Sequence, residues 1–351
     1  MSSYFKVLRP GINSTFQDLG RFGLQHLGIV ASGCMDQLLF CNSNKLVGNK
    51  VSEGTLEFAY QGPLLELVGE SALVAVSGKV NFIVIKKNGE TKQGRSNESF
   101  VIFNGDKIDI LSTIDSVYGY FSIFGGFYLK EIKGSFSTLV RAKIGPNNGD
   151  KLKINDKVFY NRFNSLGKTK KIQFNFDNDN TIRVMKGLQF NYFSKKSQED
   201  FFLKEYKITK LTDRMGMRLD GEKLENIVSK NIKSEGITKG SIQIPGDGKP
   251  IILLSDHPTI GGYPKIGNVI TADYDKLVQK TPGTKIKFKL VDLPIAENAF
   301  REYVRKFWMH FIYKIPGPIL VLLGGFSLSW GGLIIRSFES TSIWQILFYR
   351  S

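Results

Sequence analysis

The stretch from residue 235 to residue 273 constrains this chain most, because an apolar strand runs directly into a turn crowded with polar side chains. Residues 251–254 read Ile-Ile-Leu-Leu, which is typical of a buried strand, and a Pro-Gly turn precedes them. A carboxylate, a hydroxyl, a phenol and two adjacent glycines follow at once, at Asp256, Thr259, Tyr263, Gly261 and Gly262. A simple turn does not need this chemistry, so we predict a functional site here.

We interpret Asp256, Thr259 and Tyr263 as the catalytic candidates of that turn. Asp256 could orient a reacting group or accept a proton. The adjacent glycines allow close approach to the backbone, so their amides could face a developing oxyanion. Lys265 is a further candidate for binding an anion, whereas His257 is interpreted as an exposed loop residue.

A second stretch near the N-terminus is equally dense in glycine and polar residues. Gln17, Asp18 and Arg21 lie between glycines, and two readings stay open for them: a structural ion pair between Asp18 and Arg21, or a bidentate contact from Arg21 to a carboxylate or phosphate. Ser32, Gly33 and Asp36 precede a helix expected over residues 36–47. They indicate either simple N-capping or an anion site at the helix N-terminus.

Several motifs stand together in one order along the chain: Thr15-Phe16-Gln17-Asp18-Leu19-Gly20-Arg21, Ser32-Gly33-Cys34-Met35-Asp36, Asp213-Arg214-Met215-Gly216, Gln243, and Asp256 to Pro264. In this set the chain resembles the carboxyltransferase-like family. That family includes the C subunit of bacterial 5-oxoprolinase, the carboxyltransferase half of urea amidolyase and the Kip-type antagonists of a kinase inhibitor. The resemblance covers roughly residues 5–291. It implies substrate binding by the side chains or backbone of Gln17, Asp18, Arg21, Ser32, Gly33, Asp36, Arg214, Gln243, Gly261, Gly262 and Lys265.

The resemblance implies one component of an ATP-dependent 5-oxoprolinase, which cleaves 5-oxo-L-proline to L-glutamate. The expected partners are a Kip-inhibitor-like B subunit and a LamB/YcsF-type A subunit. ATP would be bound within that complex, because the chain has no G-x-x-x-x-G-K-[ST] loop. Two alternatives stay open. One is a biotin-dependent carboxyltransferase acting on urea or a related amide, with biotin on another chain. The other is a non-enzymatic Kip-type antagonist.

Two positions depart from the family pattern. Phe136 stands where the family usually has an arginine within G-S-R-S-T, and Lys186-Gly187-Leu188 stands where it has a Gly-Pro turn. If these positions contact substrate or a partner in the family, activity here would be altered.

Composition and periodicity predict the fold class. Apolar residues make up 42% of the chain, which excludes general disorder, and many short β-branched runs end in Gly or Asn. No helices of about 12 residues separate these runs, which excludes Rossmann and TIM arrangements. We predict a mainly β chain with a few short helices (α+β), and the resemblance implies two cyclophilin-like β-barrel halves. The same patterns predict a short helix over 198–206 and a hairpin over 242–254. Residues 1–292 would form the carboxyltransferase-like domain, with a connection between halves near 145–181.

Charge and rare residues limit the function classes further. The net charge is +16, but the lysines are scattered through turns and follow no nucleic-acid-binding motif, so we expect no nucleic-acid partner. Three histidines argue against a histidine metal site. Cys34 and Cys41 are expected on one helix, too far apart for a disulfide, and reduced as in a cytoplasmic protein.

The segment 293–351 reads as a divergent basic, aromatic and apolar tail. Residues 315–335 carry no charge over 21 positions and are long enough to span a bilayer. Two interpretations of this segment stay open. It is either a transmembrane anchor or a divergent end of the chain. No signal peptide is expected at the N-terminus.

Overall fold

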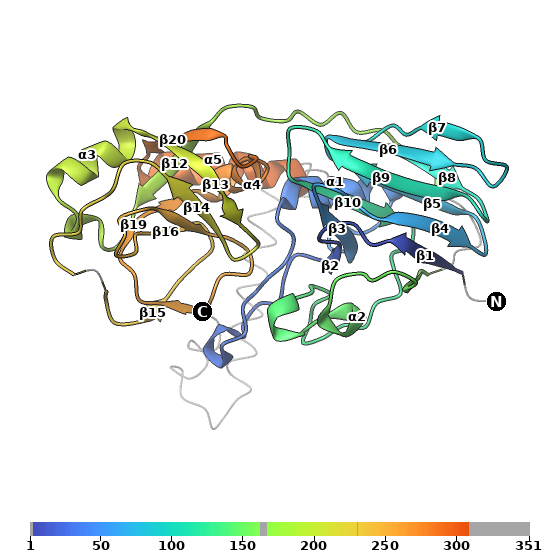
Figure 1. Cartoon of the computed structure of the whole chain (residues 1–351), viewed down its shortest axis with the longest axis horizontal. Coiled ribbons are helices and arrows are strands. Elements are labelled where there is room, and N and C mark those ends of the chain that lie inside the picture. Colours follow the sequence, from blue (N-terminus) through green and yellow to red (C-terminus); the bar gives the residue numbers. More distant parts are fainter. Residues whose placement is uncertain (1–2, 162–166, 230, 309–351) are drawn as a thin grey trace, which may run out of the picture. The chain divides into compact units, whose positions relative to one another are not determined.

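The computed structural model describes residues 3–161, 167–229 and 231–308, and these form two β assemblies joined by one connection (Figure 1). The prediction of a mainly β chain with a few short helices is confirmed. Residues 3–303 belong to one compact unit.

The first assembly consists of two antiparallel sheets packed face to face. One has six strands in the order β11 (Lys157–Phe159), β1 (Tyr4–Arg9), β4 (Leu64–Val68), β9 (Lys107–Thr113), β6 (Val80–Ile85), β7 (Thr91–Gln93). The other has five, in the order β2 (Thr15–Gln17), β3 (Thr55–Ala59), β10 (Tyr118–Ile123), β5 (Ala72–Ser77), β8 (Glu98–Ile102). Alternate residues such as Phe5, Leu67 and Phe82 meet Phe58 and Phe121 in one core, because successive side chains of a strand point to opposite faces.

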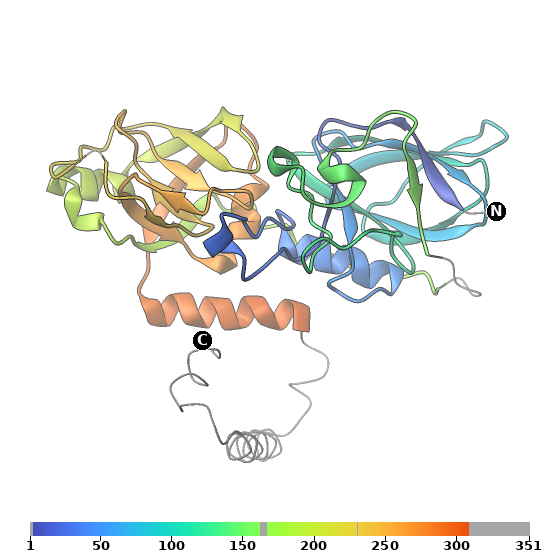
Figure 2. The same ribbon diagram turned by 90° about the horizontal axis from the view of Figure 1, so that it is seen from below.

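The helix α1 (Gln37–Val47) covers the outer face of the five-stranded sheet, against β5 and β10 (Figure 2). Both strands are therefore buried on both faces and read as apolar runs without alternation. The helix was predicted over 36–47, and its bounds follow from its caps. Asp36 accepts from the backbone N–H of Leu39, and Gly48 ends the helix in the left-handed conformation, φ 83°.

The second assembly is a closed seven-stranded barrel. Its order is β12 (Thr181–Lys186), β19 (Lys265–Val269), β16 (Ser241–Gln243), β17 (Ile251–Leu253), β14 (Gly216–Asp220), β13 (Glu205–Thr212), β20 (Lys285–Leu290). All neighbours are antiparallel except β12 and β20. Aromatic and branched side chains such as Phe201, Tyr206 and Phe288 fill its core. The predicted hairpin over 242–254 is confirmed as β16 and β17.

Two shorter helices accompany the barrel, α3 (Lys195–Leu203) and α4 (Thr271–Val278). The helix predicted over 198–206 is misplaced: Ser194 caps it, so it begins earlier, and Tyr206 belongs to β13. Tyr206 is fully buried beside Phe288 in the barrel. This packing places Tyr206 in a strand, although the local sequence pattern favours a helix.

The segment predicted to connect the halves, 145–181, is divided in the structure. Its first part contains the short helix α2 (Pro146–Gly149) and β11. Because β11 pairs with β1, this part belongs to the first assembly.

The strands β15 (Glu235–Gly236) and β18 (Ile260–Gly261) form a separate two-stranded ribbon, which shares no strand pairing with the barrel.

The helix α5 (Leu293–Trp308) follows the last barrel strand. Ala296 and Ala299 pack against Ile270 and Val291, so the helix docks through small residues. None of the described helices is both long and apolar enough to cross a membrane. The apolar segment 315–335 lies outside the described residues.

Candidate functional site

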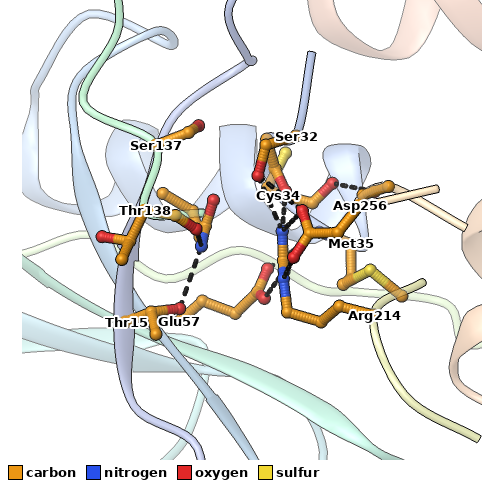
Figure 3. A network of polar contacts seen from close by, with 12 residues as sticks. Thr15, Ser32, Cys34, Met35, Glu57, Ser137, Thr138, Arg214 and Asp256 are labelled. Atoms are coloured by element: carbon orange, nitrogen blue, oxygen red, sulfur yellow. Dashed lines mark hydrogen bonds and ion pairs between the residues drawn. The ribbon is translucent and has the colours of Figure 1, made fainter. Parts of the chain in front are cut away.

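The described residues place a buried polar network where the two assemblies meet (Figure 3). The first assembly contributes Ser32 and Gly33, from the loop before α1, and Glu57 from β3. The barrel contributes Arg214, from the turn between β13 and β14, and Asp256, from the turn after β17. The network is largely shielded from water, because four side chains of the first assembly join the apolar core of the barrel beside it: Met35, Ala59, Val117 and Tyr118.

Arg214 is the centre of this network, and 7% of its side chain is exposed. Its Nε donates to Asp256 Oδ2 at 2.8 Å and its Nη2 to Asp256 Oδ1 at 3.1 Å, a bidentate contact. Its Nη1 donates to Glu57, and its Nη2 also to the carbonyl of Gly33 at 2.6 Å. Burial alone would lower the pKa of Arg214, but the carboxylates of Asp256 and Glu57 outweigh burial and raise that pKa. Arg214 therefore stays charged.

Glu57 is a member of the site that sequence reasoning missed. Its Oε2 accepts from the backbone N–H of Met35 at 2.8 Å and from the hydroxyl of Tyr120 at 2.7 Å. Burial raises the pKa of Glu57, although Arg214 and these two donors oppose the rise. A signal was present in the sequence: a lone carboxylate stands inside the apolar strand Thr-Leu-Glu-Phe-Ala, and a buried carboxylate needs a partner.

Ser32 completes the network from the loop before α1. Its hydroxyl donates to Asp256 Oδ1 at 2.5 Å. Its φ is 57°, a left-handed conformation that is uncommon for a residue other than glycine. Gly33 follows at φ 93°, where a Cβ atom would lie 2.8 Å from the carbonyl oxygen of Leu19. This tight turn directs the hydroxyl of Ser32 to Asp256 and the carbonyl of Gly33 to Arg214.

The N-terminus of α1 holds carboxylates of the chain itself. Asp36 is the N-cap, which is one of the two readings left open for it. The amides of Gln37 and Leu38 donate to Asp275 of the barrel at 3.1 and 3.0 Å. Asp275 also accepts from Tyr303 of α5 at 2.6 Å. Asp275 is therefore the acidic residue that accepts from this helix N-terminus in the structure.

Gln17, Asp18 and Arg21 form a second group inside the first assembly. Asp18 accepts from the hydroxyls of Ser135 and Ser137 and, at 2.7 Å, from the backbone N–H of Phe136. Arg21 donates to the carbonyls of Ile132 and Ser137, and no ion pair joins Asp18 to Arg21 in this described part of the chain. Gln17 Nε2 donates to Thr15 and to the carbonyl of Thr138. Phe136 replaces the arginine that the family usually has at this position, but its backbone N–H still donates to Asp18.

The remaining predicted residues gather at one end of the barrel. Lys265 forms an ion pair with Glu235, and Gln243 is buried beside Gly261. Gly262, Thr259 and Tyr263 lie in the same turn, with 41% of Tyr263 exposed. Among the described residues, no hydrogen bond joins the side chains of Asp256, Thr259 and Tyr263.

Several expectations need correction. His257 was predicted to be an exposed loop residue, but it is 3% exposed, and its Nδ1 lies 2.7 Å from the carbonyl oxygen of Pro258. It packs under the turn that follows β17, and burial lowers its pKa. Cys34 was expected on the same helix as Cys41 but lies before α1. The two cysteines form no disulfide, as predicted, and both are buried.

Comparison with known proteins decides the family. The model of the carboxyltransferase domain, subdomains A and B, matches residues 27–290. The chain belongs to this carboxyltransferase domain family.

The similar proteins include 5-oxoprolinase C subunits and urea amidolyases. The chain is 32% identical to the 5-oxoprolinase C subunit of Haemophilus influenzae, over 84% of this chain and 94% of that protein. It is 28% identical to the protein of the same name from Escherichia coli, over 86% and 96%. Among solved structures, the urea amidolyase of K. lactis is similar with a TM-score of 0.78 at 28% identity, over 87% of this chain and 20% of that one.

The structure of this carboxyltransferase-family member divides the predicted site residues into three groups. Ser32, Gly33, Arg214 and Asp256 meet at the junction, with Asp36 bound to the neighbouring helix end. Gln17, Asp18 and Arg21 lie in the first assembly, and Gln243, Gly261 and Lys265 lie at the barrel end. In the described ranges no cluster of His, Cys, Asp and Glu suits a metal ion.

Proposed function

We propose that this chain is one component of an ATP-dependent 5-oxoprolinase, which opens the lactam of 5-oxo-L-proline to give L-glutamate. The match to the 5-oxoprolinase C subunit carries the proposal, because it extends over 94% of the Haemophilus protein. The urea amidolyases match over a small part of their length, such as 17% of the protein from Lachancea kluyveri.

The chemistry of the proposed reaction fits the donors and acceptors of the chain. Nucleophilic addition to the lactam carbonyl, which precedes cleavage of the C–N bond, places negative charge on the carbonyl oxygen, and fixed donors can stabilise that charge. Arg214 is saturated by its own partners, so we assign it the role of holding Asp256 and Ser32 in position. Tyr263 is half exposed in the Gly-Gly turn and is the proton donor or acceptor that substrate can reach.

ATP does not fit the features of this chain that commonly bind phosphate. The chain has no G-x-x-x-x-G-K-[ST] loop, and the first amides of α1 already bind Asp275 and Asp36. We therefore assign ATP to the partner proteins, one Kip-inhibitor-like and one of the LamB/YcsF type. A cytoplasmic location is proposed with them, since the reaction consumes ATP.

A second candidate is a biotin-dependent carboxyltransferase acting on urea or a related amide. The structural similarity to the K. lactis urea amidolyase, with a TM-score of 0.78, favours it. In this case a biotin-bearing domain would come from another chain. The reaction would then transfer a carboxyl group and would release no glutamate from 5-oxoproline.

The two candidates are separated by an assay of glutamate release from 5-oxo-L-proline with ATP. The chain is added to, or left out of, a mixture of its Kip-inhibitor-like and LamB/YcsF-type partners. Release that requires this chain supports the oxoprolinase proposal. If this chain has no effect on release but carboxylates urea when a partner domain bearing carboxybiotin is supplied, the second candidate replaces the first. A stable complex with the Kip-inhibitor-like partner and neither activity would favour a Kip-type antagonist.

A further inference from the structure

Two cross-strand pairs are stacked at one end of the barrel. Gln243 at the end of β16 pairs with Lys265 at the start of β19, next to an irregularity in the register. Glu235 pairs with Gly261 in the ribbon of β15 and β18. Side chains join the two pairs: Lys265 Nζ binds Glu235 Oε1, and a Cβ atom on Gly261 would lie 2.6 Å from Gln243 Nε2. The ribbon therefore rests directly on this barrel pair.

Three hydrogen-bond donors lie beside the ribbon, and two of them bind Glu235. Lys265 Nζ and Gln189 Nε2, the latter at 2.9 Å, donate to the same oxygen of Glu235. The Lys265 side chain is 4% exposed. The third donor, Gln243 Nε2, is buried and has no hydrogen-bond partner among the described residues. A buried amide without an acceptor is costly, so its presence points to an acceptor that the described residues do not supply.

Glu235 differs from Lys265, to which it is bound, in its access to water. Its side chain is 37% exposed, and it stands on a ribbon strand of two residues. The hydrogen bonds from Lys265 and Gln189 lower its pKa, so it is a carboxylate at neutral pH. A displacement of Glu235 toward water would release both of these donors.

We propose that Lys265, Gln189 and Gln243 form a carboxylate-binding subsite, and that Glu235 occupies this subsite until the carboxylate of a substrate displaces it. The inference rests on the proposed function, because 5-oxoproline carries a carboxylate beside its lactam. Urea carries none. The subsite would therefore select a carboxylate-bearing lactam, and Glu235 would set its affinity by competition.

Isothermal titration calorimetry on the full chain tests the proposal with three ligands. They are 5-oxo-L-proline, 2-pyrrolidinone, which is the same lactam without the carboxylate, and glutarate, a carboxylate without the lactam. Glu235→Gln removes the competing charge and should tighten 5-oxoproline binding about tenfold, the range of one charge-assisted hydrogen bond. Lys265→Met should weaken it by about as much. Binding of 2-pyrrolidinone should change little in either variant.

Gln243→Leu is the second loss-of-donor variant, because it removes no hydrogen bond that the described structure contains and so should fold even if Lys265→Met does not. The subsite is overturned if 5-oxoproline binds Lys265→Met and Gln243→Leu as well as wild type, or if no carboxylate binds wild type or Glu235→Gln. If glutarate binds with the expected dependence on these residues but 5-oxoproline does not bind, the subsite stands and the oxoprolinase proposal fails.

Discussion

The hydroxyl of Ser32 donates to Asp256 at 2.5 Å, although 224 positions separate the two residues in the chain. Arg214 holds the same carboxylate and also binds Glu57 of the first assembly. The junction is thus fixed by a chain of charged contacts in a water-poor environment. Removing one member leaves its buried partners incompletely satisfied, so function and folding are coupled at this site.

Asp256→Ala and Tyr263→Phe should separate these two effects. Asp256→Ala deprives the buried guanidinium of Arg214 of a bidentate acceptor, and we expect the free energy of unfolding to fall by about 3 kcal/mol. Tyr263 is 41% exposed and has no hydrogen bond in the described structure, so its variant should stay within about 0.5 kcal/mol of wild type. Urea denaturation followed by circular dichroism measures both.

In both variants the rate of glutamate release from 5-oxoproline should fall about 100-fold or more. The reason is that each side chain is assigned either to proton transfer or to orienting the group that transfers the proton. Wild-type turnover by folded Tyr263→Phe would remove Tyr263 from the mechanism. Unchanged stability of Asp256→Ala would show that its contact to Arg214 contributes nothing to folding.

Tyr120→Phe tests the support behind Glu57. The hydroxyl of Tyr120 donates to Glu57 Oε2 and accepts from the backbone N–H of Asp36 at 3.0 Å. Its removal leaves a buried donor and a buried acceptor each short of one partner, at a cost of about 1–3 kcal/mol. The control is Tyr128→Phe, since Tyr128 is 75% exposed. Equal melting temperatures for the two variants would contradict the prediction.

The buried carboxyl pair of Asp36 and Asp275 should make stability depend on pH. Burial raises the pKa of both groups, and repulsion from Asp275 raises the pKa of Asp36 further. A raised pKa in the folded state means that the folded protein holds protons more tightly than the unfolded chain. The contribution of this pair is therefore fully present below the ordinary pKa of about 4 and is lost as the pH rises above it.

Asp36→Asn keeps an N-cap but cannot ionise. Its destabilisation relative to wild type should be largest near pH 4 and should shrink as the pH rises, because only wild type loses the contribution of the pair. Urea denaturation of both proteins from pH 4 to pH 8 measures the difference. A difference that is constant across this range, or that grows with pH, would contradict the assigned direction.

Gly261→Ala tests the close approach of the ribbon to the barrel. The added methyl group would meet the end of the flexible Gln243 side chain, which can move, so we expect little change in stability but weaker binding of 5-oxoproline. Gly236→Ala is the matched control in the same ribbon, because nothing lies within 4 Å of its Cβ position. If the two variants bind 5-oxoproline equally, the placement of Gln243 does not matter for the substrate.

Local signals in the sequence determined much of the fold. Asp36 and Gly48 set the ends of α1, because capping depends on the residues at the helix ends themselves. Residues 251–253 and their turn formed a hairpin with β16 as expected. The helix predicted over 198–206 was misplaced because the burial of Tyr206 is a property of the barrel core, which periodicity does not report.

The sequence by itself also determined the family and the motif residues, since these depend on residue order alone. The tertiary structure decided which of them meet. Asp256 was predicted in one group with Thr259 and Tyr263, but its hydrogen bonds go to Arg214 and Ser32. Glu57 and Glu235 gain their roles from partners 157 and 30 positions away. Such partners are chosen by how strands pair and assemblies pack, and burial then makes each contact strong enough to matter.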